Sequence, residues 1–279
     1  MKKLNVIAAL LCTGTLFAQS PWTKKKNEGY IQVSYSTIAN YTKLFGNPDY
    51  STERKITDNT LQLYGEFGLS DKTTLFASVP LKMVKSGDLV SQSVLALPFT
   101  RPESKTALGN VQLGVKHNFY NKKWVLSAQL GIEANTGEYS EASGLRTGYD
   151  AWTFTPLFLA GRGFDKWYIQ AFTGFDIRTN QYSSAYKLGG EAGYKAVDWL
   201  WVAGFLDGVA SLKNGDLVIP IANSYTGLYV NNQSYAAFGL KLIGEINEHF
   251  GLNAGIGGAV GGRNVAKKPA LSAGLYYKF

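Results

Sequence analysis

LSAGLYYKF, residues 271–279, alternates between two kinds of side chain. Its odd-numbered positions hold Leu, Ala, Leu, Tyr and Phe279, which are all apolar, whereas its even-numbered positions include Ser, Gly and Lys278. Because successive side chains of a β-strand point to opposite faces, this pattern predicts a strand with one apolar face.

The same alternation recurs along the chain in segments of about ten residues, the length of a tilted strand that crosses a bilayer. Examples are 61–69, 75–83, 111–119, 167–177 and 186–194. Apart from one histidine, the apolar face of these segments carries no ionisable group. Because backbone groups in lipid must pair within the protein, the strands are expected to close into a barrel.

The connections between the strands alternate between short polar turns and long loops. Five short turns and six long loops make eleven connections, which predicts twelve strands; ten or fourteen are the alternatives. Both chain ends then lie on the short-turn side. The fold class predicted is all-β, a single transmembrane antiparallel barrel over residues 19–279. The long loops are expected near residues 40–57, 84–107, 136–149, 178–185, 209–233 and 260–269.

The first 18 residues have the form of a cleaved signal peptide. Lys2 and Lys3 precede an apolar run that reaches Phe17, and Ala18 is a suitable cleavage position. Cys12 is the only cysteine, so the mature chain would have neither disulfides nor thiol chemistry.

The formal charge of +8 becomes +6 when the two lysines of the signal peptide are removed. Much of the excess lies in segments expected to be exposed, including Lys24, Lys122 and Lys267, so a solvated surface is favoured over nucleic-acid binding. No apolar run long enough for a membrane helix follows residue 18. With two histidines and no mature cysteine, the sequence predicts no metal site and no cofactor.

An outer-membrane enzyme that modifies lipid is the less favoured alternative. Such an enzyme would need a histidine to activate a serine, with a third group to orient the ring. His249 lies in a short turn, and His117 comes just before another turn, where an interfacial surface role is expected.

Two stretches resemble a known family. YGEFGLSDKTTLFASVPL at 64–81 and LGNVQLGVKHNFY at 108–120 are similar to the outer-membrane family of phenol meta-pathway-like transporters. The strand that ends at Phe279 resembles the C-terminal signal strand of bacterial outer-membrane barrels. These resemblances imply a twelve-stranded barrel in the outer membrane of a Gram-negative bacterium. The implied partners are membrane lipid, lipopolysaccharide, small hydrophobic solutes, and the periplasmic chaperones and barrel-assembly machinery.

The polar face of the strands is expected to line the lumen and carries both signs of charge in equal number. A channel for acidic oligosaccharides would instead show a basic excess. Gln170, Glu191 and Lys241 lie nearest mid-height and are predicted to form a constriction. The other predicted pore-lining residues are Lys116, Glu133, Asp176, Arg178, Lys187, Asp207 and Glu245. The alternative is that these charges pair across strands and only brace the barrel.

Two of the long outer loops are unusually apolar, which favours a role in solute capture. The alternative is that they extend the strands or fold inward as a plug. The predicted capture residues are Leu95, Leu97 and Phe99 in one loop and Val218, Ile219 and Ile221 in the other.

The sequence therefore predicts a non-enzymatic outer-membrane channel for small uncharged molecules that are hydrophobic or aromatic. A structural or adhesive barrel without transport is the main alternative.

Overall fold

The computed structural model describes residues 19–91 and 98–279; the predicted signal peptide and capture residues Leu95 and Leu97 lie outside this range. No helix in the described residues is long and apolar enough to cross a membrane. The elements are β1 (Gly29–Phe45), β2 (Tyr50–Ser70), β3 (Thr73–Leu89), β4 (Glu103–Leu108), β5 (Gln112–Asn121), β6 (Val125–Glu133), β7 (Thr153–Gly163), β8 (Trp167–Arg178), β9 (Ala185–Val197), β10 (Leu200–Ser211), α1 (Ile221–Ser224), β11 (Ser234–Glu245), β12 (Phe250–Arg263), β13 (Val265–Ala266) and β14 (Ala270–Lys278).

The strands form one closed antiparallel barrel. Each strand pairs with its neighbour along the chain, and β1 closes the ring by pairing with both β14 and β2. The strands β4 and β5 are two parts of one barrel strand, because both pair with β3, over residues 81–86 and 73–78 respectively. The two-residue β13 only extends the edge of β1. The predicted twelve-stranded barrel is confirmed.

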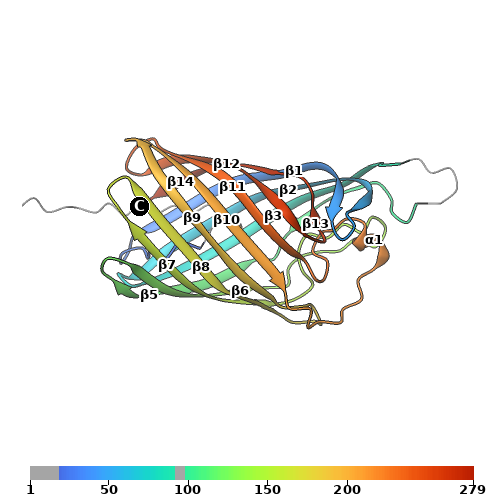
Figure 1. Ribbon diagram of the computed structural model, residues 1–279, viewed down its shortest axis with the longest axis horizontal. Helices are drawn as coiled ribbons and strands as arrows, with labels where there is room; N and C mark the ends of the chain where they lie inside the picture. Colours follow the sequence, from blue (N-terminus) through green and yellow to red (C-terminus); the bar gives the residue numbers. More distant parts are fainter. Residues whose placement is uncertain (1–18, 92–97) are drawn as a thin grey trace, which may run out of the picture.

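The two ends of the barrel differ. The short turns and the C-terminus lie at one end, whereas the long connections, β13 and α1 lie at the other (Figure 1). The prediction of a long loop over residues 40–57 is wrong, because β1 and β2 continue to a turn at residues 46–49 and pair as far as Leu44 and Tyr50. This extension buries Tyr41, Leu44 and Ile56 in a hydrophobic cluster, which a solvated loop could not do.

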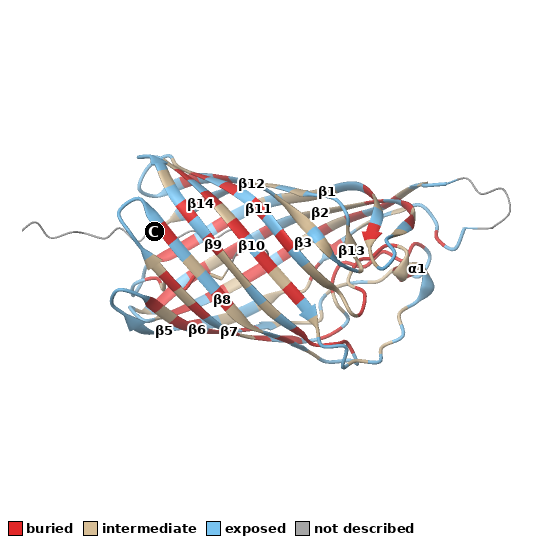
Figure 2. Cartoon of the chain, viewed as in Figure 1, coloured by how far each residue is buried: buried red, intermediate tan, exposed pale blue. Residues whose placement is uncertain are grey.

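Burial alternates along each strand in the way expected of a membrane barrel (Figure 2). On β5, Leu113 is 61% exposed on the outside, whereas Lys116 is 1% exposed on the inside. On β9, Leu188 is exposed and Glu191 is buried. Apolar side chains therefore cover the outer surface, and polar and aromatic side chains fill the interior.

Glycine lets the interior aromatic rings lie against the barrel wall. A Cβ atom on Gly193 of β9 would lie 2.0 Å from the ring of Tyr168 on β8. A Cβ atom on Gly239 of β11 would lie 2.4 Å from the ring of Phe205 on β10. At both places only glycine leaves room for a ring that would otherwise have to project further into the lumen.

Candidate functional site

A cluster of aromatic side chains lines the half of the lumen next to the short turns, here called the inner half. The ring of Tyr30 stacks on Tyr276 at 5.5 Å and meets Tyr64 edge-on at 6.4 Å. On the strands β8 and β10, Tyr168 and Trp201 lie 5.5 Å apart. The charges of this face predicted that it lines the lumen, but they gave no indication of the aromatic cluster. Tyrosines at polar positions, such as Tyr64 and Tyr168, were the available signal.

Residues 19–28 precede β1. The first of them, residues 19–24, lie in the inner half of the lumen, whereas residues 25–28 are exposed at the short-turn end. Lys116 on β5 donates from Nζ to the backbone oxygen of Ser20 at 3.0 Å. The ring of Trp22 packs edge-on against Tyr168 at 6.1 Å. These contacts place the N-terminal segment against the aromatic cluster, so it fills space that a solute would otherwise cross.

Lys24 of this segment belongs to a buried group of charges. The carboxylate of Glu66 lies 3.1 Å from Lys116 Nζ and 3.5 Å from Lys24 Nζ. The Tyr64 hydroxyl also donates to Glu66 at 2.9 Å. The expectation that Lys24 is exposed is wrong, because its residue is only 4% exposed. A buried carboxylate needs cations and hydrogen-bond donors around it, and Lys24 meets that need.

The three residues predicted at mid-height lie together. Lys241 on β11 forms an ion pair with Glu191 on β9, and Gln170 on β8 donates to the same carboxylate at 3.2 Å. The Tyr168 hydroxyl donates to Glu191 at 2.6 Å. Gln170, Glu191 and Lys241, together with Gln19, border a cavity of about 20 Å³, which has room for about one water molecule. Their control of passage stays a prediction.

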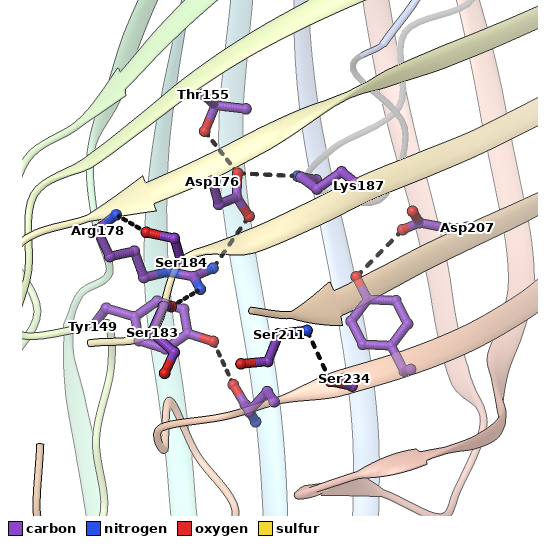
Figure 3. Close-up of polar contacts among 12 residues, drawn as sticks. Tyr149, Thr155, Asp176, Arg178, Ser183, Ser184, Lys187, Asp207, Ser211 and Ser234 are labelled. Atoms are coloured by element: carbon purple, nitrogen blue, oxygen red, sulfur yellow. Dashed lines mark hydrogen bonds and ion pairs between the residues drawn. The ribbon is translucent and has the colours of Figure 1, made fainter. Parts of the chain in front are cut away.

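A second charged group lies nearer the long loops, in the outer half of the lumen (Figure 3). Asp176 on β8 pairs with Arg178 at 3.1 Å and with Lys187 on β9 at 3.6 Å. It also accepts a hydrogen bond from Thr155 at 2.8 Å. Asp207 on β10 accepts one from the Tyr235 hydroxyl at 3.3 Å. Carboxylates and cations therefore compensate one another across neighbouring strands.

The remaining predicted pore-lining residues lie at different heights. Glu133, at the end of β6, lies close enough to Asp176, Lys187 and Arg178 for their charges to act on it. Glu245 instead pairs with Lys278 at 3.1 Å next to the short turns. The ten predicted pore-lining residues thus belong to several separate groups along the lumen.

Two long loops close the outer mouth, and they are held to each other. Asn223 in the loop of residues 212–233 donates from Nδ2 to the backbone oxygens of Gly144 at 3.1 Å and Leu228 at 2.9 Å. The Tyr41 hydroxyl of β1 donates to the backbone oxygen of Thr226 at 2.6 Å. We call these two loops, 134–152 and 212–233, the outer cap.

The described capture residues lie on the surface of the outer mouth. Val218 is 89% exposed, Ile221 is also exposed and Ile219 is half-buried. The exposed ring of Phe99 stacks on Tyr225 at 5.9 Å, so the two apolar loops meet. Solute capture by these residues stays a prediction.

Neither histidine has the surroundings of a catalytic base. Both are exposed; His117 contacts the Thr73 hydroxyl at 2.9 Å, and His249 contacts the backbone oxygen of Lys278 at 2.8 Å. Within residues 19–91 and 98–279, no carboxylate orients either ring. In the same ranges, no three His, Cys, Asp or Glu side chains form a group that could hold a metal ion.

Comparison with known proteins points to one family and one fold. A family model described as "Putative MetA-pathway of phenol degradation" matches residues 87–275. An outer-membrane channel from Pseudomonas putida F1 has a TM-score of 0.71 at 14% identity, with 92% of this chain and 97% of that chain covered. The KdgM porin in complex with disordered oligogalacturonate has a TM-score of 0.54 at 9% identity, with 90% and 99% covered. The NanC porin has a TM-score of 0.53 at 9% identity, with 89% and 100% covered. No curated protein matches the sequence.

Proposed function

From the premise that the chain belongs to the family described as "Putative MetA-pathway of phenol degradation", we propose that it is an outer-membrane channel for small hydrophobic or aromatic molecules. The barrel would lie in the outer membrane of a Gram-negative bacterium, with the short turns in the periplasm. The outer-membrane barrels that share its fold support this location.

The aromatic cluster of the inner half is the observation that carries the proposal. Tyr30, Tyr64, Phe76, Tyr168, Trp201 and Tyr276 are buried in this cluster, with Trp22 packed against it. When the N-terminal segment moves away, their ring faces and edges would suit an aromatic solute. A channel for a polyanion would need an excess of basic side chains to attract it. Here the lumenal cations Lys116, Lys187 and Lys241 all lie beside carboxylates, so their fields largely cancel.

The N-terminal segment governs passage in this proposal. Trp22 packs against Tyr168, and the Ser20 backbone accepts a hydrogen bond from Lys116, so this segment occupies the lumen beside the aromatic cluster. In this proposal a monoaromatic solute reaches the aromatic cluster when residues 19–24 move away from it.

The test is uptake of a labelled monoaromatic hydrocarbon by intact, porin-deficient cells that express the protein. Ala203 points into the aromatic cluster and is buried, whereas its neighbour Val202 faces outward and is exposed. Ala203→Trp should reduce uptake at least several-fold, because the large ring fills the pathway. Val202→Trp adds the same ring on the lipid side and should leave uptake near the wild-type rate.

Two results would contradict the proposal. One is equal uptake by cells with and without the folded wild-type protein, which would favour the structural or adhesive barrel. The other is faster entry of a neutral sugar than of the hydrocarbon, which would indicate a general aqueous pore.

A further inference from the structure

A groove at the outer mouth combines an apolar wall with a polar one. It has a volume of about 380 Å³, within the usual range for a small-molecule site. Leu217, Val218, Ile219 and Pro220 form one part of its lining. The polar part consists of Arg146, Asp150, Asn180, Gln181 and Tyr182. These residues come from both loops of the outer cap and from the connection between β8 and β9.

Arg146 is buried without a counter-ion. Only 8% of the residue is exposed, and no carboxylate of the described chain lies within ion-pair distance of its guanidinium. Its Nε atom is buried and donates to no described group. The guanidinium lies over the ring of Tyr139, at 4.5 Å. A buried cation that lacks a carboxylate is costly, and an anion bound beside it would remove that cost.

Tyr182 offers a second donor on the same lining. The residue is 4% exposed, and its oxygen lies towards the backbone N–H of Asp150. The hydroxyl proton has no acceptor among residues 19–91 and 98–279. Asp150 does not neutralise Arg146, because its carboxylate is exposed and accepts a hydrogen bond from Asn135 at 2.6 Å.

We propose that this groove binds a small organic carboxylate, with the anionic head held by Arg146 and Tyr182 and the hydrocarbon body against Leu217–Pro220. A guanidinium suits a carboxylate because its planar donors match the two oxygens. This inference rests on the proposed channel function. It extends the solute class from neutral aromatic molecules to aromatic acids, and it makes the outer cap the place where these acids first bind.

The first experiment compares ligands on the wild-type protein, folded in detergent micelles, by isothermal titration calorimetry. Benzoate carries both features, benzyl alcohol lacks the charge and acetate lacks the ring. Benzoate should bind at least tenfold more tightly than either. Equal affinity for benzoate and benzyl alcohol, or no benzoate binding at millimolar concentration, would overturn the proposal.

The second experiment assigns the site. Arg146→Gln should weaken benzoate binding about tenfold or more, and Tyr182→Phe should weaken it less, since it removes one neutral donor and keeps the ring. The control is Arg101→Gln, which loses the same charge from an exposed position outside the groove. Resistance of the folded barrel to SDS without heating verifies each variant. An equal loss for Arg101→Gln and Arg146→Gln would contradict the assignment.

The two proposals fail separately. If the wild type binds benzoate but does not speed hydrocarbon uptake, the channel is wrong and the binding site stands. If uptake is fast but neither groove variant weakens benzoate binding, the binding site is wrong and the channel stands. Should Arg146→Gln not fold, the wild-type ligand ranking and Tyr182→Phe still decide.

Discussion

The inner half and the outer mouth of this barrel are both filled, but by different interactions. In the inner half, Glu66 is held between Lys116 of the wall and Lys24 of the N-terminal segment. At the outer mouth, the cap is held by neutral hydrogen bonds from side chains such as Asn223 to backbone oxygens and by apolar contacts of Leu145 and Leu228 with the barrel, without a buried ion pair among these contacts. Breaking a buried ion pair leaves a charge without a partner, whereas a neutral hydrogen bond contributes only about 0.5–1.5 kcal/mol. The inner closure should therefore be firm and the outer cap adaptable.

The largest effect is expected from Glu66→Gln. This change leaves Lys24 and Lys116 buried without a carboxylate and should lower the free energy of unfolding by about 3–5 kcal/mol. Urea denaturation of the barrel in lipid vesicles measures it. The control is Glu138→Gln at the outer mouth, where the exposed Glu138 pairs with a half-buried Lys105 and should contribute at most about 1 kcal/mol. Similar losses for both variants would remove the distinction between the two ends.

The same outer face of each strand is expected to meet lipid in both halves of the barrel. Leu113→Arg places a cation on the outer surface and should cost about 2–4 kcal/mol near the bilayer midplane. Its neighbour Gln112→Arg points to the lumen, opposite Glu133 of β6, and should cost much less. Folding yields into lipid vesicles report the difference. Equal yields would show that the faces are reversed.

The adaptability of the outer cap is tested by Asn223→Ala. Asn223 is fully buried, so its loss leaves the oxygens of Gly144 and Leu228 without this donor, at a local cost of about 1–3 kcal/mol. Hydrogen exchange should rise in residues 212–233, while exchange in the barrel strands should stay unchanged. Ser224→Ala, at a half-buried neighbour, should change little. If exchange rose in the strands as well, the cap and the barrel would form one cooperative unit.

The smallest effect concerns ion selectivity at mid-height. Lys241→Gln leaves Glu191 in excess and should shift the reversal potential in planar bilayers towards cations. Glu191→Gln should shift it in the opposite direction, which separates a charge effect from a folding defect. If the wild type conducts and neither variant moves the potential, these residues do not lie on the ion pathway.

Local alternation was enough to predict the barrel, its twelve strands and the outward position of residues such as Leu113 and Leu188. Each strand must place apolar side chains towards lipid at every second residue, so this information lies within about ten residues of sequence. The grouping of Gln170, Glu191 and Lys241 could also be predicted, because residues at the same height on neighbouring regular strands lie side by side.

Contacts between distant segments were decided only by the tertiary structure. Lys24 resembles a surface lysine in sequence, and it is buried because Glu66 and Lys116 lie beside it after the barrel closes. Residues 40–57 look like a polar loop, yet Tyr41 and Ile56 gain burial against the outer cap and so extend the strands. The unpaired guanidinium of Arg146 has no local signature either. The sequence determines which face of each strand meets lipid, whereas the partners of each buried charge depend on which segments meet inside the closed barrel.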